Sequence, residues 1–118
     1  MRICVSSIGD DLDSIVDDEF GMCDYFIIVD SDTMDYKAIP NEASRSPHGT
    51  GAMAAQSVVG LGVDVVLTGF VGPHAKRILR DAGIEIVEGI EGTVRSAIER
   101  YLKKREERET VRRKTKGH

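Results

Sequence analysis

The chain has 118 residues, the length of one domain with a single hydrophobic core. Its hydrophobic share of 41% and its charged share of 31% are those of a soluble globular protein, and its formal net charge is −4 at pH 7. No apolar run is long enough to span a bilayer, so we expect neither a membrane-spanning segment nor a membrane partner.

The charge is distributed unevenly along the chain. Residues 103–118 carry eight Lys or Arg and three Glu, about +5, while residues 1–102 carry eight basic and seventeen acidic residues, about −9. The acidic body argues against a broad nucleic-acid surface, because it would repel the phosphate backbone, and we expect no nucleic-acid partner. The basic end could contact an acidic partner or nucleic acid, but such a run is more typical of a solvated helix end, so residues 103–118 are predicted to be a frayed or disordered tail.

The first residues of the chain and its cysteine content both bear on the cellular compartment. Residues 1–5 form an apolar run of strand length without the pattern of a signal peptide. Cys4 and Cys23 make neither a CxxC pair nor a disulfide framework. We therefore expect a cytoplasmic protein.

The first half of the chain predicts strands at 2–6, 24–30 and 35–41. Residues 24–30 are rich in aromatic and β-branched side chains, and a short turn joins them to 35–41, which predicts an antiparallel hairpin. The acidic stretch 10–19 lacks the spacing and the central glycine of an EF-hand, so it is expected to be a solvated loop.

The second half alternates strands and helices. It predicts a helix at 52–59, a strand at 63–68, a helix at 74–82, a strand at 84–87 and a helix that begins near Thr93. Strand–helix–strand units make parallel strands through right-handed crossovers. The predicted fold is therefore an α/β domain over residues 1–102, with a mixed five-stranded sheet in the general order of the ribonuclease H-like fold.

Residues 46–51 read as a glycine-rich loop that opens a helix of small residues. Gly49 and Gly51 let a ligand approach the backbone, and the amides and dipole of the first helical turn favour an anion. His48 could ligate a metal or donate to an oxyanion or sulfide. The alternative is a tight loop followed by a helix that packs closely on the sheet through Ala and Gly.

Several short motifs occur together in one order. They are Phe20-Gly21, Gly49-x-Gly51-x-x-Ala54-Ala55-Gln56, Gly62 to Gly69, Gly72-Pro73-His74-Ala75, Leu79, Ala82-Gly83-Ile84 and Gly92-Thr93-Val94. Over about residues 1–102 the chain resembles the dinitrogenase iron–molybdenum cofactor biosynthesis family. The resemblance implies a ribonuclease H-like fold and non-catalytic binding, storage or delivery of a metal–sulfur cluster, either like the iron–molybdenum cofactor or another Fe–S, Mo or Cu sulfide. It also implies partner proteins that donate and accept the cluster.

In an open α/β sheet a ligand sits beyond the carboxyl ends of the parallel strands, where the loops 6–9, 47–51 and 69–74 could meet. A sulfide cluster is anionic and soft, so it would take backbone amides and an imidazole or thiolate. The expected cofactor-binding residues are Ser7, His48, Gly49, Thr50, Gly51, Gly69 and Gly72. The expected metal ligands are His48 first, then Cys23, then His74.

Each of these ligands has a structural alternative. The two histidines can be ordinary loop and helix-start residues, and Cys23 can be a small apolar filler, as Cys4 is expected to be in mid-strand. Two cysteines cannot supply the four thiolates of an ordinary iron–sulfur site, so cluster binding should be labile.

The sequence does not carry the residues of a nuclease of the same fold. A ribonuclease H-like nuclease needs carboxylates in the first strand, in the first helix and near the end of the fourth strand. The first strand offers Cys4 and Ser6, the first helix has no acid, and Asp64 lies at the wrong end of its strand, so we expect no enzyme. Two alternatives stay open, a metal-free interaction or regulatory domain and an anion- or phosphate-binding protein that uses the same loops. The expected state is a monomer or weak homodimer.

Overall fold

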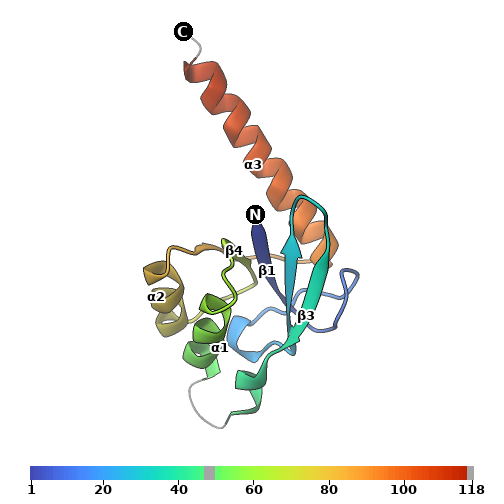
Figure 1. Ribbon diagram of the computed structural model, residues 1–118, viewed down its shortest axis with the longest axis vertical. Helices are drawn as coiled ribbons and strands as arrows, with labels where there is room; N and C mark the ends of the chain where they lie inside the picture. The colour runs from blue at the N-terminus through green and yellow to red at the C-terminus, as the bar shows by residue number, and fades with distance from the viewer. Residues whose placement is uncertain (47–49, 117–118) are drawn as a thin grey trace.

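The computed structural model describes residues 1–46 and 50–116, without the side chains of residues 50 and 114–116. The strands are β1 (Arg2–Ser7), β2 (Tyr25–Asp30), β3 (Tyr36–Pro40), β4 (Val65–Leu67) and β5 (Glu85–Val87). The helices are α1 (Thr50–Val59), α2 (Pro73–Asp81) and α3 (Val94–Lys116), with the short 3-10 helices η1 (Phe20–Met22) and η2 (Glu42–Arg45). The predicted mixed five-stranded α/β sheet and its element order are confirmed (Figure 1).

The sheet has the strand order β3-β2-β1-β4-β5. β2 pairs antiparallel with both β1 and β3, which confirms the predicted hairpin. β1, β4 and β5 run parallel, so their carboxyl ends lie at the same edge of the sheet. This edge is where an α/β sheet of this kind offers a binding surface.

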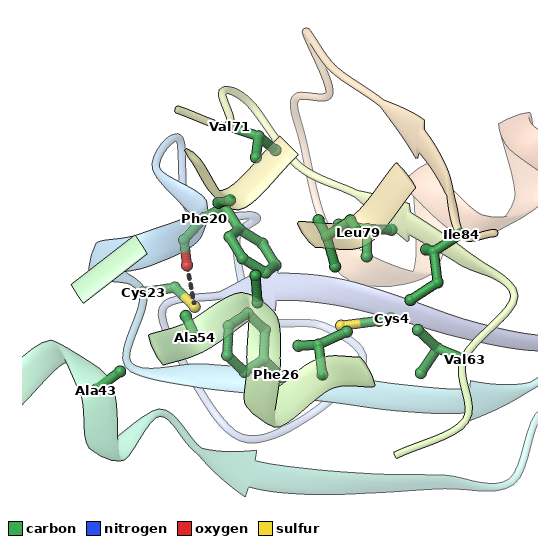
Figure 2. Packing of buried hydrophobic residues seen from close by; sticks show 14 residues of the cluster. Cys4, Phe20, Cys23, Phe26, Ala43, Ala54, Val63, Val71, Leu79 and Ile84 are labelled. Atoms are coloured by element: carbon green, nitrogen blue, oxygen red, sulfur yellow. Dashed lines mark hydrogen bonds between the residues drawn. The ribbon is translucent and has the colours of Figure 1, made fainter. Parts of the chain in front are cut away.

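Two apolar layers cover the sheet. On one face α1 and α2 pack on a cluster that includes Cys4, Phe26 and Leu79, which Figure 2 shows from close by. On the other face α3 packs through Ile98 and its neighbours on side chains such as Ile3. Successive residues of β1 therefore enter opposite layers, and β4 is buried on both faces as its continuous apolar run predicts.

The acidic segment 10–19 is more than a solvated loop. Its carboxylates are mostly exposed, but Leu12 and Val16 are buried in the α3 layer. Its backbone also accepts the first amides of α3, because Arg95 N donates to Leu12 O at 2.8 Å and Val94 N donates to Ser14 O at 2.9 Å. The segment thus satisfies donors that a helix start leaves without internal partners.

The last helix departs from the expected frayed or disordered tail. α3 begins at Val94, with the Thr93 hydroxyl accepting Ser96 N at 3.1 Å as an N-cap, and continues past Leu102 to Lys116. Lys, Arg and Glu are good helix formers, and Arg105 pairs with Glu109 four residues on at 3.8 Å. The distal part of α3 projects away from the sheet (Figure 1). Among the described helices none is both long and apolar enough to cross a membrane.

Candidate functional site

Two hydroxyl groups join the carboxyl ends of β1 and β4. Ser6 Oγ and Thr68 Oγ1 lie 2.7 Å apart and are buried. Ser6 Oγ donates its proton to Asp17 O at 2.8 Å, so the Thr68 hydroxyl is the donor in the pair. Asp17 N in turn donates to Ser6 O at 2.9 Å, which fixes the backbone at Asp17 across the strand ends.

The loop after β4 is held against the segment that leads into η1. Glu19 and Phe70 form an isolated parallel β-bridge, in which Phe20 N donates to Phe70 O at 3.0 Å. A Cβ on Gly69 would lie 2.4 Å from Asp18 O. This contact with the chain's own backbone explains Gly69 as a packing requirement, although the sequence suggested a ligand contact.

Gly72, the other expected glycine of this loop, has open space around it. No atom lies within 4 Å of the position that a Cβ would take, and its φ of −67° suits any residue. Gly72 is the N-cap of α2 and, because it has no side chain, cannot accept a hydrogen bond from the amides of the first turn through one. Its position leaves the backbone accessible at the start of the helix.

Glu88 anchors the same loop from β5's end of the sheet. Its Oε2 accepts Val71 N at 3.0 Å, and its Oε1 pairs with Lys76 Nζ at 2.8 Å. The hydrogen bond from Lys76, and after it the one from the Val71 amide, lowers the pKa of Glu88. Sequence reasoning missed Glu88, because no short motif connects it to a loop 17 residues earlier.

The predicted histidine ligands fall in different situations. His74 is exposed on the first turn of α2. The start of α1 lies beside this turn, since a Cβ on Gly51 would be 3.8 Å from the Ala75 Cβ. His48, Gly49 and the side chain of Thr50 lie outside the described residues. The first turns of α1 and α2 therefore lie side by side, and a Cβ on Gly51 would make only an ordinary van der Waals contact with Ala75.

Cys23 faces the core rather than this surface. Its thiol is buried and donates to Phe20 O at 3.3 Å, as the dashed line in Figure 2 marks, while Asn41 Nδ2 lies 3.7 Å from the sulfur. Burial raises the pKa of the Cys23 thiol to about 12. Its role as a ligand stays a prediction, and in this conformation the thiol is neutral and shielded. Cys4 is in the core as expected.

Ser7 is also used internally. Its hydroxyl donates to Gly9 O at 2.7 Å and accepts Gly9 N at 3.2 Å, which turns the chain after β1. The side chain is fully buried. Ser7 therefore shapes the strand end, and a direct contact with a ligand would require this turn to open.

Among the large apolar side chains that the described structure exposes, three belong to η1, α1 and the loop after β4, and the sequence analysis did not identify them. Met22 on η1 is 51% exposed, Met53 on α1 44% and Phe70 59%. Their elements touch one another, because η1 packs on α1 and Phe20 bonds Phe70. Thioether and aromatic groups are soft and polarisable, and they suit a sulfide-rich ligand better than they suit water.

The geometry does not assemble a hydrolytic metal centre in the described part of the chain. Within residues 1–46 and 50–116, no three His, Cys, Asp or Glu side chains gather into a metal-binding group. Asp64 lies before β4, where it accepts Arg2 N at 2.7 Å, at the end of the strand opposite Thr68. The carboxylate pattern of a ribonuclease H-like nuclease is absent from the described strand ends.

The chain matches one family profile and is similar to proteins of known structure and sequence. The sequence profile of the family described as "Dinitrogenase iron-molybdenum cofactor" matches residues 1–104, which confirms the resemblance. The apo form of the orange protein from Desulfovibrio gigas is 40% identical, with a TM-score of 0.83 over 86% of this chain and 87% of that one. A putative NifB protein from Thermotoga is 34% identical, with a TM-score of 0.75 over the same shares. An uncharacterized protein of Methanocaldococcus jannaschii is 27% identical over 70% of this chain and 73% of its own length.

Proposed function

Because the chain belongs to the dinitrogenase iron-molybdenum cofactor family, we propose that it is a non-catalytic carrier that binds, stores or delivers a metal–sulfur cluster. The observation that carries this proposal is the extent of the family match, which spans residues 1–104 and thus the whole sheet, α1, α2 and the first part of α3. The 40% identity with the orange protein supports it. The cluster is cargo, and the proposal includes donor and acceptor proteins in the cytoplasm.

We place the cluster at the surface where η1, the loop Gly69–Gly72 and the first turns of α1 and α2 meet. The amides of the helix starts offer positive partial charge to an anionic sulfide cluster. The exposed His74 imidazole offers a metal ligand, and the thioethers of Met22 and Met53 offer soft contacts. His48 stays an expected ligand on the segment that leads into α1.

The base of this surface is held in place by hydrogen bonds. The Ser6–Thr68 pair ties two strand ends together, and Glu88 holds Val71 next to α2. A surface that is fixed before binding loses little conformational entropy when a ligand arrives. The strand order β3-β2-β1-β4-β5 also supports the assignment to the ribonuclease H-like fold.

The test is cluster content after purification without oxygen. We expect metal with acid-labile sulfide and a visible charge-transfer band, either as isolated or after reconstitution with ferrous iron and sulfide or with thiomolybdate and Cu(I). His74→Ala and His48→Ala should lower the bound metal. Cys4→Ala is the matched control for Cys23→Ala, because both remove a buried thiol from the same apolar layer.

The outcomes separate the candidate functions. A loss of metal in Cys23→Ala but not in Cys4→Ala would make Cys23 a ligand that becomes exposed on loading. A colourless wild type that takes up no cluster from either mixture would overturn the carrier proposal. Binding of inorganic phosphate to such a protein would instead favour the anion-binding alternative.

A further inference from the structure

Part of α3 lies beyond the domain and carries a stripe of positive charge. Lys104, Arg108 and Arg112 are four residues apart, so they lie along one side of the helix. All three are exposed, and within the described residues none of them pairs with a carboxylate. We call these three residues the basic stripe.

The basic stripe borders a groove as well as open solvent. Lys104 and Arg108 line a groove of about 440 Å³ between α3 and the edge strand β5. Further along, Val111 lies between Arg108 and Arg112, with Glu107 beside them. The stripe thus carries two arginines, a residue type enriched at protein interfaces, and borders one exposed apolar side chain, Val111.

The opposite charge lies on the same chain, in the acidic segment 10–19. Asp10, Asp18 and Glu19 are exposed there, and among the described residues no Lys, Arg or His pairs with them. Residues 1–102 carry about −9 and residues 103–118 about +5. The chain is therefore strongly dipolar, which favours attraction between unlike ends of two copies at low ionic strength.

The basic stripe cannot reach the acidic segment of its own chain. α3 starts against that segment, where Val94 N donates to Ser14 O, and then runs away from it (Figure 1). At 1.5 Å per residue, Lys104 and Arg112 lie roughly 15 and 27 Å along the helix from Val94. Complementary contacts between the two regions must therefore be made between molecules.

From this arrangement we propose that the distal part of α3 docks on the acidic segment of a second copy of this chain, giving a salt-sensitive self-association. The exposed carboxylates supply the partner for the basic stripe, and the acidic body disfavours nucleic acid in the same role. The inference does not rest on cluster binding.

The experiment is sedimentation velocity of the full chain over a range of concentrations, in low and high salt. Wild type should form a species larger than the monomer in low salt and dissociate in high salt. R108E/R112E reverses two charges of the stripe and should weaken association about tenfold, in line with two lost exposed ion pairs. K103E/R113E is the matched control, because it makes the same change in net charge at exposed positions away from the stripe.

A mixture of two charge-reversed variants tests whether the acidic segment of a second copy is what binds the basic stripe. D10K/D18K alone should also associate more weakly than wild type, because its acidic segment then attracts the stripe less. An equimolar mixture of D10K/D18K with R108E/R112E should associate again, since the reversed charges match. Circular dichroism of each variant checks that α3 is still formed.

Three results would overturn the proposal. They are a monomeric wild type in low salt, an equal loss in K103E/R113E, and a failure of the mixture to associate. If the monomeric wild type instead bound duplex DNA with a steep salt dependence, the stripe would be assigned to nucleic acid.

Discussion

Ser6 donates to the Asp17 carbonyl and accepts from the Thr68 hydroxyl 2.7 Å away, so one side chain links β1, the residue after β4 and the acidic segment. Ser6→Ala leaves the Thr68 hydroxyl and the Asp17 carbonyl without this partner, whereas Thr68→Val removes only one donor. We expect Ser6→Ala to lower the free energy of unfolding by about 2 kcal/mol and Thr68→Val by about 1 kcal/mol. Urea denaturation followed by circular dichroism measures both, and a larger loss in Thr68→Val would contradict this assignment of donors.

Gly69 and Gly72 provide a matched pair of substitutions. Gly69→Ala places a Cβ against Asp18 O, so the two backbones must separate, and we expect a loss of about 1–3 kcal/mol. Gly72→Ala adds a methyl group in open space at an ordinary φ, and its effect should stay within about 0.5 kcal/mol. The midpoints of thermal unfolding compare them. Equal losses would mean that the strand-end loop is not packed as described.

The carboxylate of Glu88 predicts a dependence of stability on pH. Lys76 and the Val71 amide lower its pKa below the ordinary 4.5, so its contribution is complete above pH 4.5 and is lost as the pH falls through the lowered value. Glu88→Gln should therefore be less stable than wild type near neutral pH, and the difference should shrink in acid. Unfolding free energies at about pH 7 and about pH 3 test this.

Glu91→Gln serves as the control for Glu88→Gln, because it removes an exposed carboxylate from the same loop. Its unfolding free energy should differ little from that of wild type at either pH. A gap between Glu88→Gln and wild type that stays constant with pH would contradict the ionised contact with Lys76.

The buried thiol of Cys23 should react slowly with thiol reagents in the folded protein. Its pKa of about 12, against an ordinary 9.0, lowers the thiolate fraction about a thousandfold at neutral pH, and burial blocks access as well. We expect both cysteines to be labelled only after unfolding in urea, as measured by the absorbance of a disulfide reagent. Rapid labelling of Cys23 without denaturant would show that the thiol is already available to a metal.

Much of the fold follows from the sequence because its signals are local. The aromatic and β-branched run of β2, the short turn to β3 and the Pro73 that begins α2 each act within a few residues. The extent of α3 was harder to predict. Residues beyond Leu102 have no apolar face, and the helix depends there on the propensity of Lys, Arg and Glu and on pairs such as Arg105–Glu109.

The candidate site was less predictable because its contacts join distant parts of the chain. The need for glycine at position 69 cannot be inferred from its sequence neighbours, because Asp18, whose carbonyl lies against it, is 51 positions earlier in the chain. Cys23 follows a family motif, but its direction depends on how η1 packs against α1. His74 is the predicted ligand that the structure places on the surface at this edge.

The amides of Val94 and Arg95 donate to the backbone of the acidic segment, whose Asp17 N donates to Ser6 O of β1, and Phe20, the next residue after the segment, donates to Phe70 O. α3 is 23 residues long, roughly 34 Å from end to end, and these hydrogen bonds hold only its first turn. Because α3 also packs on the sheet through Val94, Ala97 and Ile98, a rotation of α3 would disturb this packing and these hydrogen bonds together. The direction in which the far end of α3 points therefore depends on the same hydrogen bonds that order the loops around the strand ends.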